Sequence, residues 1–109
     1  MTYANNKKVS AVVVKQFRVK KMISEADRKV IVDLSKQYRA KKVLLFGSSL
    51  ISMKANDIDL GVEGIADQDY FKFYGDLMFS LSKPVDLIDL GSTSKFTSIV
   101  KEEGLLIYG

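Results

Sequence analysis

The chain has 109 residues, a formal net charge of +4, no cysteine and no histidine. This length fits a single domain, and the missing residue types exclude disulfides, thiolate metal sites and any mechanism that needs imidazole as a base or zinc ligand. No apolar run in the sequence is long enough to span a bilayer, so we expect a cytoplasmic protein without a membrane segment, whose acid–base chemistry comes from carboxylates, lysines or tyrosines.

The charge is divided unevenly along the chain. Residues 1–42 contain 12 of the 17 basic residues and only three acids, whereas the remainder has an excess of acids. We expect residues 1–23 to form a basic N-terminal arm and residues 24–109 to form the domain. The basic residues of 1–42 are either a contact for nucleic acid or an acidic partner, or a solvated surface that keeps the protein soluble. Composition leaves both interpretations open.

The first half of the domain begins with a helix and a strand. Within the arm, residues 9–19 fit either a strand or a helix. Ser24, followed by acids that include Asp27, predicts a capping-box start for an amphipathic helix over residues 25–40. A short apolar strand, covered on both faces, is predicted at 41–46. A short helix over 48–53 would follow, and its N-terminus would favour a bound phosphate.

The next strand and helix follow directly. A strand is predicted over residues 57–63, and Asp67 is expected to cap a helix that continues to about residue 82. The spacing of its apolar residues predicts an inward-facing stripe. This stripe comprises Tyr70, Phe73, Tyr74, Leu77, Met78 and Leu81.

The C-terminal part repeats the alternation. A strand is predicted at 85–90, and Ser92 or Ser94 is expected to start a last helix with Phe96, Ile99 and Val100 facing inward. Gly104 would end that helix in a left-handed conformation, and residues 105–108 would add a terminal strand. Strands that alternate with helices predict an α/β (α+β) fold with a single mixed sheet and helices packed on it.

The middle of the chain carries the pattern that points to chemistry. Asp57 and Asp59 project from the same face of their predicted strand, while Ile58 projects from the other. Neighbouring carboxylates repel each other unless a cation lies between them, and hard oxygen ligands suit Mg²⁺. The preceding Gly47-Ser48 turn suits phosphate, because glycine lets backbone N–H groups approach the oxygens closely. Together these features predict phosphoryl or nucleotidyl transfer.

These motifs resemble the minimal nucleotidyltransferase family, the small single-domain members of the DNA polymerase beta-type nucleotidyltransferase superfamily. The family signature is a strand ending in Gly-Ser, a spacer, an Asp-x-Asp pair, a third Asp on a later strand and a characteristic C-terminal ending. The matching stretches here are Gly47-Ser48, Asp57-Ile58-Asp59, residues 85–90 and residues 99–108. The resemblance covers about residues 24–108 and implies the nucleotidyltransferase fold.

The resemblance also implies roles for the carboxylates. Asp57 and Asp59 would hold Mg²⁺ on the triphosphate of ATP or another nucleoside triphosphate, with two ions ~3.5–4 Å apart. Asp86 would complete the metal site and take the proton of the acceptor hydroxyl. Alternation along the strand does not by itself select Asp86 over Asp89; the family pattern selects Asp86.

The same resemblance assigns the phosphate contacts. Gly47, Ser48 and Ser49 would receive the phosphates through backbone N–H and hydroxyl groups. Lys54 would supply a point charge where the family often carries an arginine, without the bidentate geometry of a guanidinium.

The activity implied is transfer of a nucleoside monophosphate, most simply AMP from ATP, to a hydroxyl acceptor. We expect these 109 residues to lack the substrate-binding domain of larger superfamily members, and we therefore expect the acceptor to come from a partner. Proteins of this kind often act beside a small helical HEPN-type protein in toxin–antitoxin pairs.

Two other functions remain open. The spacer between Ser48 and Asp57 is eight residues, shorter than the common family pattern, and residues 50–52 lack the arginine. Both features favour a degenerate, antitoxin-like binding module that acts by binding its partner. Phosphohydrolases of the haloacid dehalogenase type also use Asp-x-Asp after an apolar strand, but there the pair lies on the opening strand, whereas here a helix and a Gly-Ser strand precede it.

Overall fold

The computed structural model describes residues 22–47 and 55–109. In chain order their elements are α2 (Glu25–Gln37), β1 (Lys42–Phe46), β2 (Ile58–Glu63), α3 (Asp67–Ser80), β3 (Val85–Asp89), α4 (Lys95–Glu103) and β4 (Leu105–Tyr108). The segment 9–19, expected to be a strand or a helix, and the expected helix at 48–53 lie outside the described residues. None of the helices in the described part of the chain is long and apolar enough to cross a membrane.

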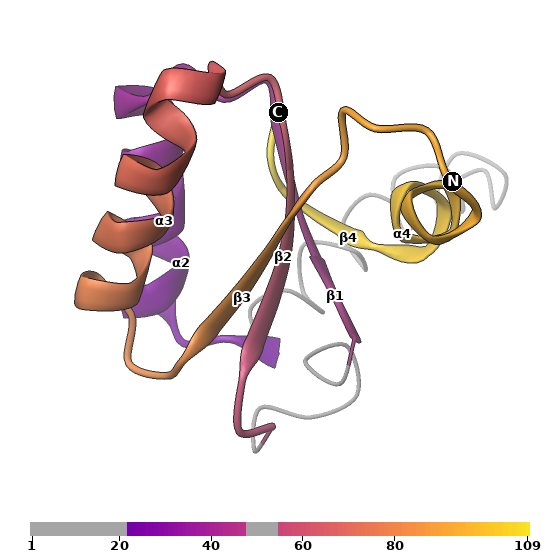
Figure 1. Cartoon of the computed structure of the whole chain (residues 1–109). Coiled ribbons are helices and arrows are strands. Elements are labelled where there is room, and N and C mark those ends of the chain that lie inside the picture. The colour runs from indigo at the N-terminus through magenta and orange to yellow at the C-terminus, as the bar shows by residue number, and fades with distance from the viewer. Residues whose placement is uncertain (1–21, 48–54) are drawn as a thin grey trace, which may run out of the picture.

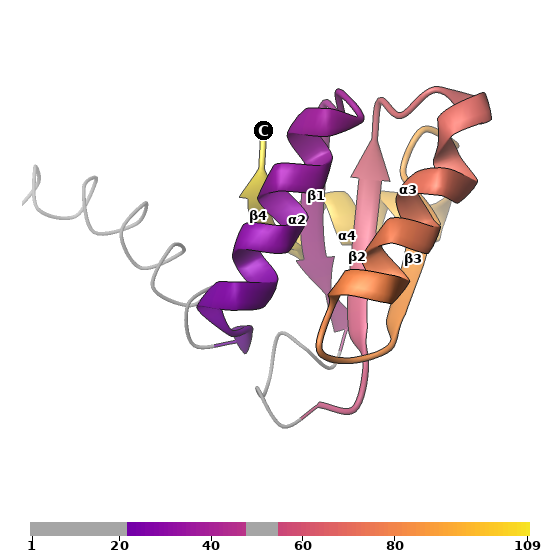
Figure 2. The same cartoon turned by 90° about the vertical axis from the view of Figure 1, so that its left-hand side faces the viewer.

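The four strands form one mixed sheet in the order β3-β2-β1-β4. β1 is antiparallel to both β2 and β4, whereas β2 and β3 are parallel and are joined through α3. Helices α2 and α3 cover one face of the sheet, and α4 lies on the other side (Figures 1 and 2). This is the predicted α+β architecture with a single mixed sheet, and the prediction is confirmed.

The main core lies between the sheet and the pair α2–α3. Its fully buried side chains include Ile31 of α2 and Phe73 and Leu77 of α3. Ile23, which precedes α2, is also buried in this core. A smaller cluster on the other face joins Leu44, Leu90 and Val100, with Phe46 and Ile88 packed against it. The second cluster positions α4 over only part of that face.

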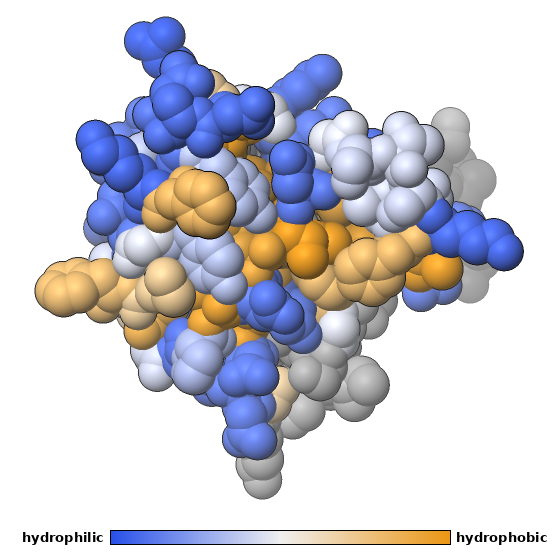
Figure 3. Space-filling model, viewed as in Figure 1, coloured by the Kyte–Doolittle hydropathy of each residue, from blue (hydrophilic) through white to orange (hydrophobic). Residues whose placement is uncertain are grey.

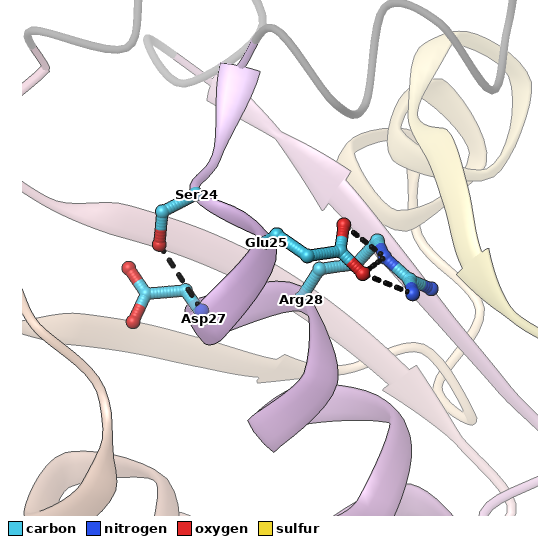
Figure 4. Close-up of polar contacts among 4 residues, drawn as sticks. All are labelled: Ser24, Glu25, Asp27 and Arg28. Carbon is cyan, nitrogen blue, oxygen red and sulfur yellow. Dashed lines mark hydrogen bonds and ion pairs between the residues drawn. The ribbon is translucent and has the colours of Figure 1, made fainter.

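The start of α2 is held by two separate contacts. The Ser24 hydroxyl accepts a hydrogen bond from the Asp27 backbone N–H at 3.1 Å, as expected for an N-cap, and Glu25 pairs with Arg28 on the exposed side (Figure 4). The Asp27 carboxylate, however, points to the α3–β3 connection, where it accepts hydrogen bonds from the backbone N–H and hydroxyl of Ser82. Asp27 thus links two elements rather than closing a capping box.

Several local expectations were wrong for identifiable reasons. Asp67 begins α3, but the N-cap is Ala66 and no side chain caps that end. Met78 was expected in the core, yet it is exposed, as are Phe71 and Phe79, because the inward stripe of α3 is narrower than its apolar composition suggests. Helix α2 ends at Gln37 rather than near residue 40, since Arg39 adopts a left-handed conformation.

The last helix departs from expectation on its outer surface and at its end. Ser94 is the N-cap and forms a capping box with Thr97, which decides between the two serines considered. Phe96 and Ile99 were expected to face inward, but they are 54% and 53% exposed. Gly104 is extended (φ −65°), not left-handed. Glycine fits there because a Cβ would lie 2.6 Å from the Val100 carbonyl oxygen.

Candidate functional site

The candidate site is built on the parallel pair β2–β3. Asp59 on β2 and Asp86 on β3 are register partners, and Asp59 also pairs with Phe46 across the antiparallel β1. Paired residues on adjacent strands project to the same face, so all three side chains lie on the α4 side of the sheet. Asp59 is half-buried and Asp86 is exposed. The structure therefore brings together carboxylates that lie 27 positions apart in the sequence.

Gly47 closes this site on the β1 side. It follows directly after β1 in a left-handed conformation (φ +72°), and a Cβ built on it would lie 2.3 Å from the Asp59 Oδ2. Only a residue without a side chain leaves room for the Asp59 carboxylate at this turn. The Gly47 backbone and the Asp59 carboxylate are thus close neighbours.

Asp57 lies immediately before β2 and is exposed. Asp57 therefore lies at the end of the sheet where β2 and β3 begin. At that end the Ile58 N–H donates a hydrogen bond to the Pro84 carbonyl, which directly precedes β3. Asp57, Asp59 and Asp86 therefore gather at one end of two adjacent strands. Among the side chains that the structure describes, no three carboxylates lie close enough together to form a ready metal site.

The donor set nevertheless suits Mg²⁺ rather than a softer metal. The donor atoms are carboxylate oxygens only, because the chain has no histidine or cysteine. The Asp59 carboxylate occupies the space that a side chain at position 47 would fill. An ion shared with a triphosphate needs only one or two protein carboxylates, and Asp59 and Asp86 already share one register position.

Asp89, the alternative third carboxylate, is placed differently. It pairs with Val62 and lies two residues after Leu87, both of which belong to the main core, so its side chain is on the α2–α3 side of the sheet. Its Oδ1 accepts a hydrogen bond from the Gly91 N–H at 2.8 Å, which stabilises the turn after β3. Asp89 is therefore separated from the face that carries Asp59.

The remaining nucleotide contacts expected from the sequence, Ser48, Ser49 and Lys54, lie outside the described residues. The same is true of half of the basic segment 1–42. Within the described half, Arg28 pairs with Glu25, and the other basic side chains are exposed. These are Lys29, Lys36, Arg39, Lys41 and Lys42. Nucleic-acid binding by this segment stays a prediction.

A small pocket adjoins the site. It measures about 230 Å³ and lies between the end of β1 and α4, with Phe46, Gly47, Phe96, Ile99 and Glu103 among its lining residues. The rings of Phe46 and Phe96 meet edge to face, with centroids 5.9 Å apart. Sequence reasoning missed this pocket. The available signal was the spacing of Phe96, Ile99 and Glu103, which places them on one face of α4.

Comparison with known proteins identifies the fold. No protein-family model and no curated protein matches the sequence. Among solved structures, a toxin–antitoxin crystallised with AMP-PNP matches with a TM-score of 0.63 and 24% identity, over 75% of this chain and 73% of the other. The toxin–antitoxin MntA-HepT matches with a TM-score of 0.58 and 24% identity, over 76% and 70%.

This is the nucleotidyltransferase fold. At this level of identity the likeness shows the fold and not the activity. The neighbours are consistent with the resemblance, seen in the sequence, to minimal nucleotidyltransferases that pair with a HEPN-type protein.

Proposed function

We propose that the protein is a nucleotidyltransferase that moves AMP from ATP to a hydroxyl group of a partner protein. The observation that carries this proposal is the in-register pair Asp59–Asp86, which shares one sheet face and of which Asp59 lies against the side-chain-free Gly47. This arrangement supplies acidic groups and a close-approach backbone within one small area, and nucleotidyl transfer needs both.

In the proposed site, Asp57, Asp59 and Asp86 would hold Mg²⁺, and the backbone at Gly47 would receive the β- and γ-phosphates. Bound there, Mg²⁺ would neutralise the negative charge that develops on the phosphates. Asp59 fixes the triphosphate beside Gly47, because the two already lie in contact. Asp86, the more exposed of the paired acids, is left facing the acceptor.

The reaction balances with these groups alone. The acceptor hydroxyl oxygen forms a bond to the α-phosphorus, while the bond from that phosphorus to the bridging oxygen breaks and pyrophosphate leaves with the electron pair. The hydroxyl proton passes to a carboxylate oxygen of Asp86. No histidine is available in the chain for this role, and a carboxylate base suits a proton made more acidic near a cation.

The acceptor is proposed to belong to a small helical HEPN-type protein. The two solved structures named above are toxin–antitoxin structures, and one of them was crystallised with the nucleotide analogue AMP-PNP. The described elements form one sheet and its covering helices, so the acceptor is proposed to come from outside them.

A second candidate is a binding module that neutralises its partner without catalysis. It is favoured by the eight-residue spacer, by the absence of arginine in residues 50–52 and by the lack of a ready three-carboxylate cluster in the described ranges. Incubation with Mg²⁺, ATP labelled on the α-phosphate and a candidate HEPN-type partner separates the two candidates. Label on the partner supports transfer. Stable partner binding without label supports the module.

A further inference from the structure

The pocket beside Gly47 is apolar and aromatic, although it opens next to a strongly acidic site. Phe46 and Phe96 form its walls, and Phe96 and Ile99 keep about half of their surface exposed. Exposed apolar side chains that line a concave surface are typical of ligand sites. Figure 3 shows apolar surface between the sheet and α4 on the face that it displays. The walls are thus suited to a flat apolar group.

The position of the pocket limits what that group can be. Gly47 both contacts Asp59 and lines the pocket, so a molecule held by its phosphates at the Gly47 turn reaches the pocket without leaving the site. Strand β2, which carries Asp59, lies between β3 and β1. The acceptor is proposed to bind beside Asp86 on β3, whereas the pocket lies at the end of β1, so the two are on opposite sides of Asp59. The pocket therefore belongs to the nucleotide rather than to the acceptor.

Size and chemistry agree with a nucleobase. A volume of about 230 Å³ is below the roughly 300–1,000 Å³ that hold a whole drug-sized ligand, and it suits one ring system. Aromatic side chains such as Phe96 bind bases by stacking, which tolerates any base.

Glu103 adds a source of selectivity. It is the last residue of α4 and lines the pocket, although the dipole at a helix C-terminus disfavours a carboxylate there. An ionised carboxylate only accepts hydrogen bonds. It therefore matches an exocyclic amino group, as on adenine, and not a carbonyl at the same position, as on hypoxanthine.

We infer that this pocket is the nucleobase subsite, with Phe96 as the stacking platform and Glu103 as the acceptor for an exocyclic amino group. The inference rests on the proposed function and deepens it, because it assigns where the nucleoside is held and predicts a preference for ATP over inosine triphosphate.

The test compares binding of Mg²⁺-ATP and Mg²⁺-tripolyphosphate by calorimetry, since tripolyphosphate keeps the phosphates and lacks the base. Wild-type protein should bind ATP more tightly than tripolyphosphate. Phe96→Ala should weaken ATP binding by about 5- to 150-fold, the range of stacking contributions, and leave tripolyphosphate binding unchanged. Phe96→Leu, which keeps an apolar side chain, should also weaken ATP binding. Glu103→Gln should remove the preference for ATP over inosine triphosphate.

Phe79→Ala is the matched control. Phe79 is 93% exposed on α3, across the sheet from the pocket, so its loss should change neither the affinity for ATP nor that for tripolyphosphate. Thermal unfolding of each variant checks that it is folded. The inference is overturned if ATP and tripolyphosphate bind equally to wild type, or if Phe96→Ala behaves like Phe79→Ala. It is also overturned if Phe96→Ala spares ATP binding and weakens only transfer to the partner, because the pocket would then hold an acceptor side chain. If the protein binds tripolyphosphate and ATP with equal affinity, the nucleobase subsite is wrong but the proposed function is not contradicted. Absence of binding by both ligands removes the proposed function as well.

Discussion

Asp59 of β2 and Asp86 of β3 occupy the same register position of two parallel strands and project from the same face of the sheet. Like charges held side by side in this way disfavour one another unless a cation or a proton intervenes. Such a pair has no value for packing, since an apolar pair would stabilise the same position without the repulsion. The site proposed above gives this relationship a role, because a Mg²⁺ ion between the two carboxylates would offset their repulsion.

The first prediction concerns these acids. Asp86→Asn should reduce Mg²⁺-dependent transfer of AMP by at least about 10²-fold, the lower end of the contribution of a positioned acid–base group. Asp59→Asn should also reduce transfer, because it removes a proposed carboxylate ligand of Mg²⁺. Asp86→Asn should not lower the free energy of unfolding, because Asp86 is exposed on the edge strand β3 and the change removes one of two neighbouring like charges. Label transfer and urea unfolding measure the two quantities on the same preparations.

Asp89→Asn is the control for that pair. Its side chain lies on the opposite face, and asparagine can still accept the hydrogen bond from Gly91. Transfer by this variant should match wild type. A loss equal to that of Asp86→Asn would instead make Asp89 the third carboxylate and contradict the assignment made from the register.

The choice between Asp86 and Asp89, which the family pattern made but strand alternation could not, shows what periodicity alone could and could not predict. The order of helices and strands, the mixed sheet and the acids at 57 and 59 follow from periodicity and turn residues. The register between β2 and β3 does not, because the strands are joined through α3 and pair only in the folded protein. The orientation of α4 could not be predicted from periodicity either. Of the three apolar residues expected to face inward, Val100 is buried, whereas Phe96 and Ile99 are about half exposed.

The second prediction uses two glycines. Gly47→Ala should lower the free energy of unfolding by about 1–2 kcal/mol, because alanine is strained at φ +72°. Its Cβ would also displace the Asp59 carboxylate, so Mg²⁺-dependent ATP binding should be lost. Gly75→Ala provides the contrast: Gly75 lies within α3, where an added Cβ would meet nothing within 4 Å, and alanine should stabilise the helix by about 0.5–1 kcal/mol. Denaturant titration of both variants, with calorimetric ATP binding, checks the pair. Equal stability changes would refute the role of the Gly47 turn.

The third prediction concerns the buried Asp27. This residue is 5% exposed, and its carboxylate accepts hydrogen bonds from the Ser82 N–H, at 3.0 Å, and hydroxyl. Asp27→Ala would leave both donors without this partner, and we expect the free energy of unfolding to fall by about 2–4 kcal/mol. Asp33→Ala, at an exposed position of the same helix, should change it by less than about 0.5 kcal/mol. Urea unfolding distinguishes them. A small effect at Asp27 would show that the link between α2 and the α3–β3 connection contributes little.

The fourth prediction is a pH dependence at Tyr70, whose hydroxyl donates a hydrogen bond to the Leu87 carbonyl at 3.2 Å. Burial, together with the nearby charges of Asp89 and Asp86, raises the pKa of Tyr70 above its usual 10.0. The folded protein therefore holds this proton more tightly than the unfolded chain does. The resulting stability is fully present below about pH 10 and is lost as the pH rises through the folded-state pKa.

Tyr70→Phe isolates this effect, because all other titrating groups are common to both proteins. Near neutral pH the variant should be less stable than wild type by about 0.5–1.5 kcal/mol, the usual contribution of one hydrogen bond. Above about pH 10 the difference should shrink, since only wild type has a phenol whose ionisation favours the unfolded chain. Urea unfolding at about pH 7, 9 and 11, on either side of the ordinary tyrosine pKa, measures the difference directly. A gap that stays constant or widens with pH would mean that the Tyr70 hydroxyl is not held in its neutral form by the contact between α3 and β3.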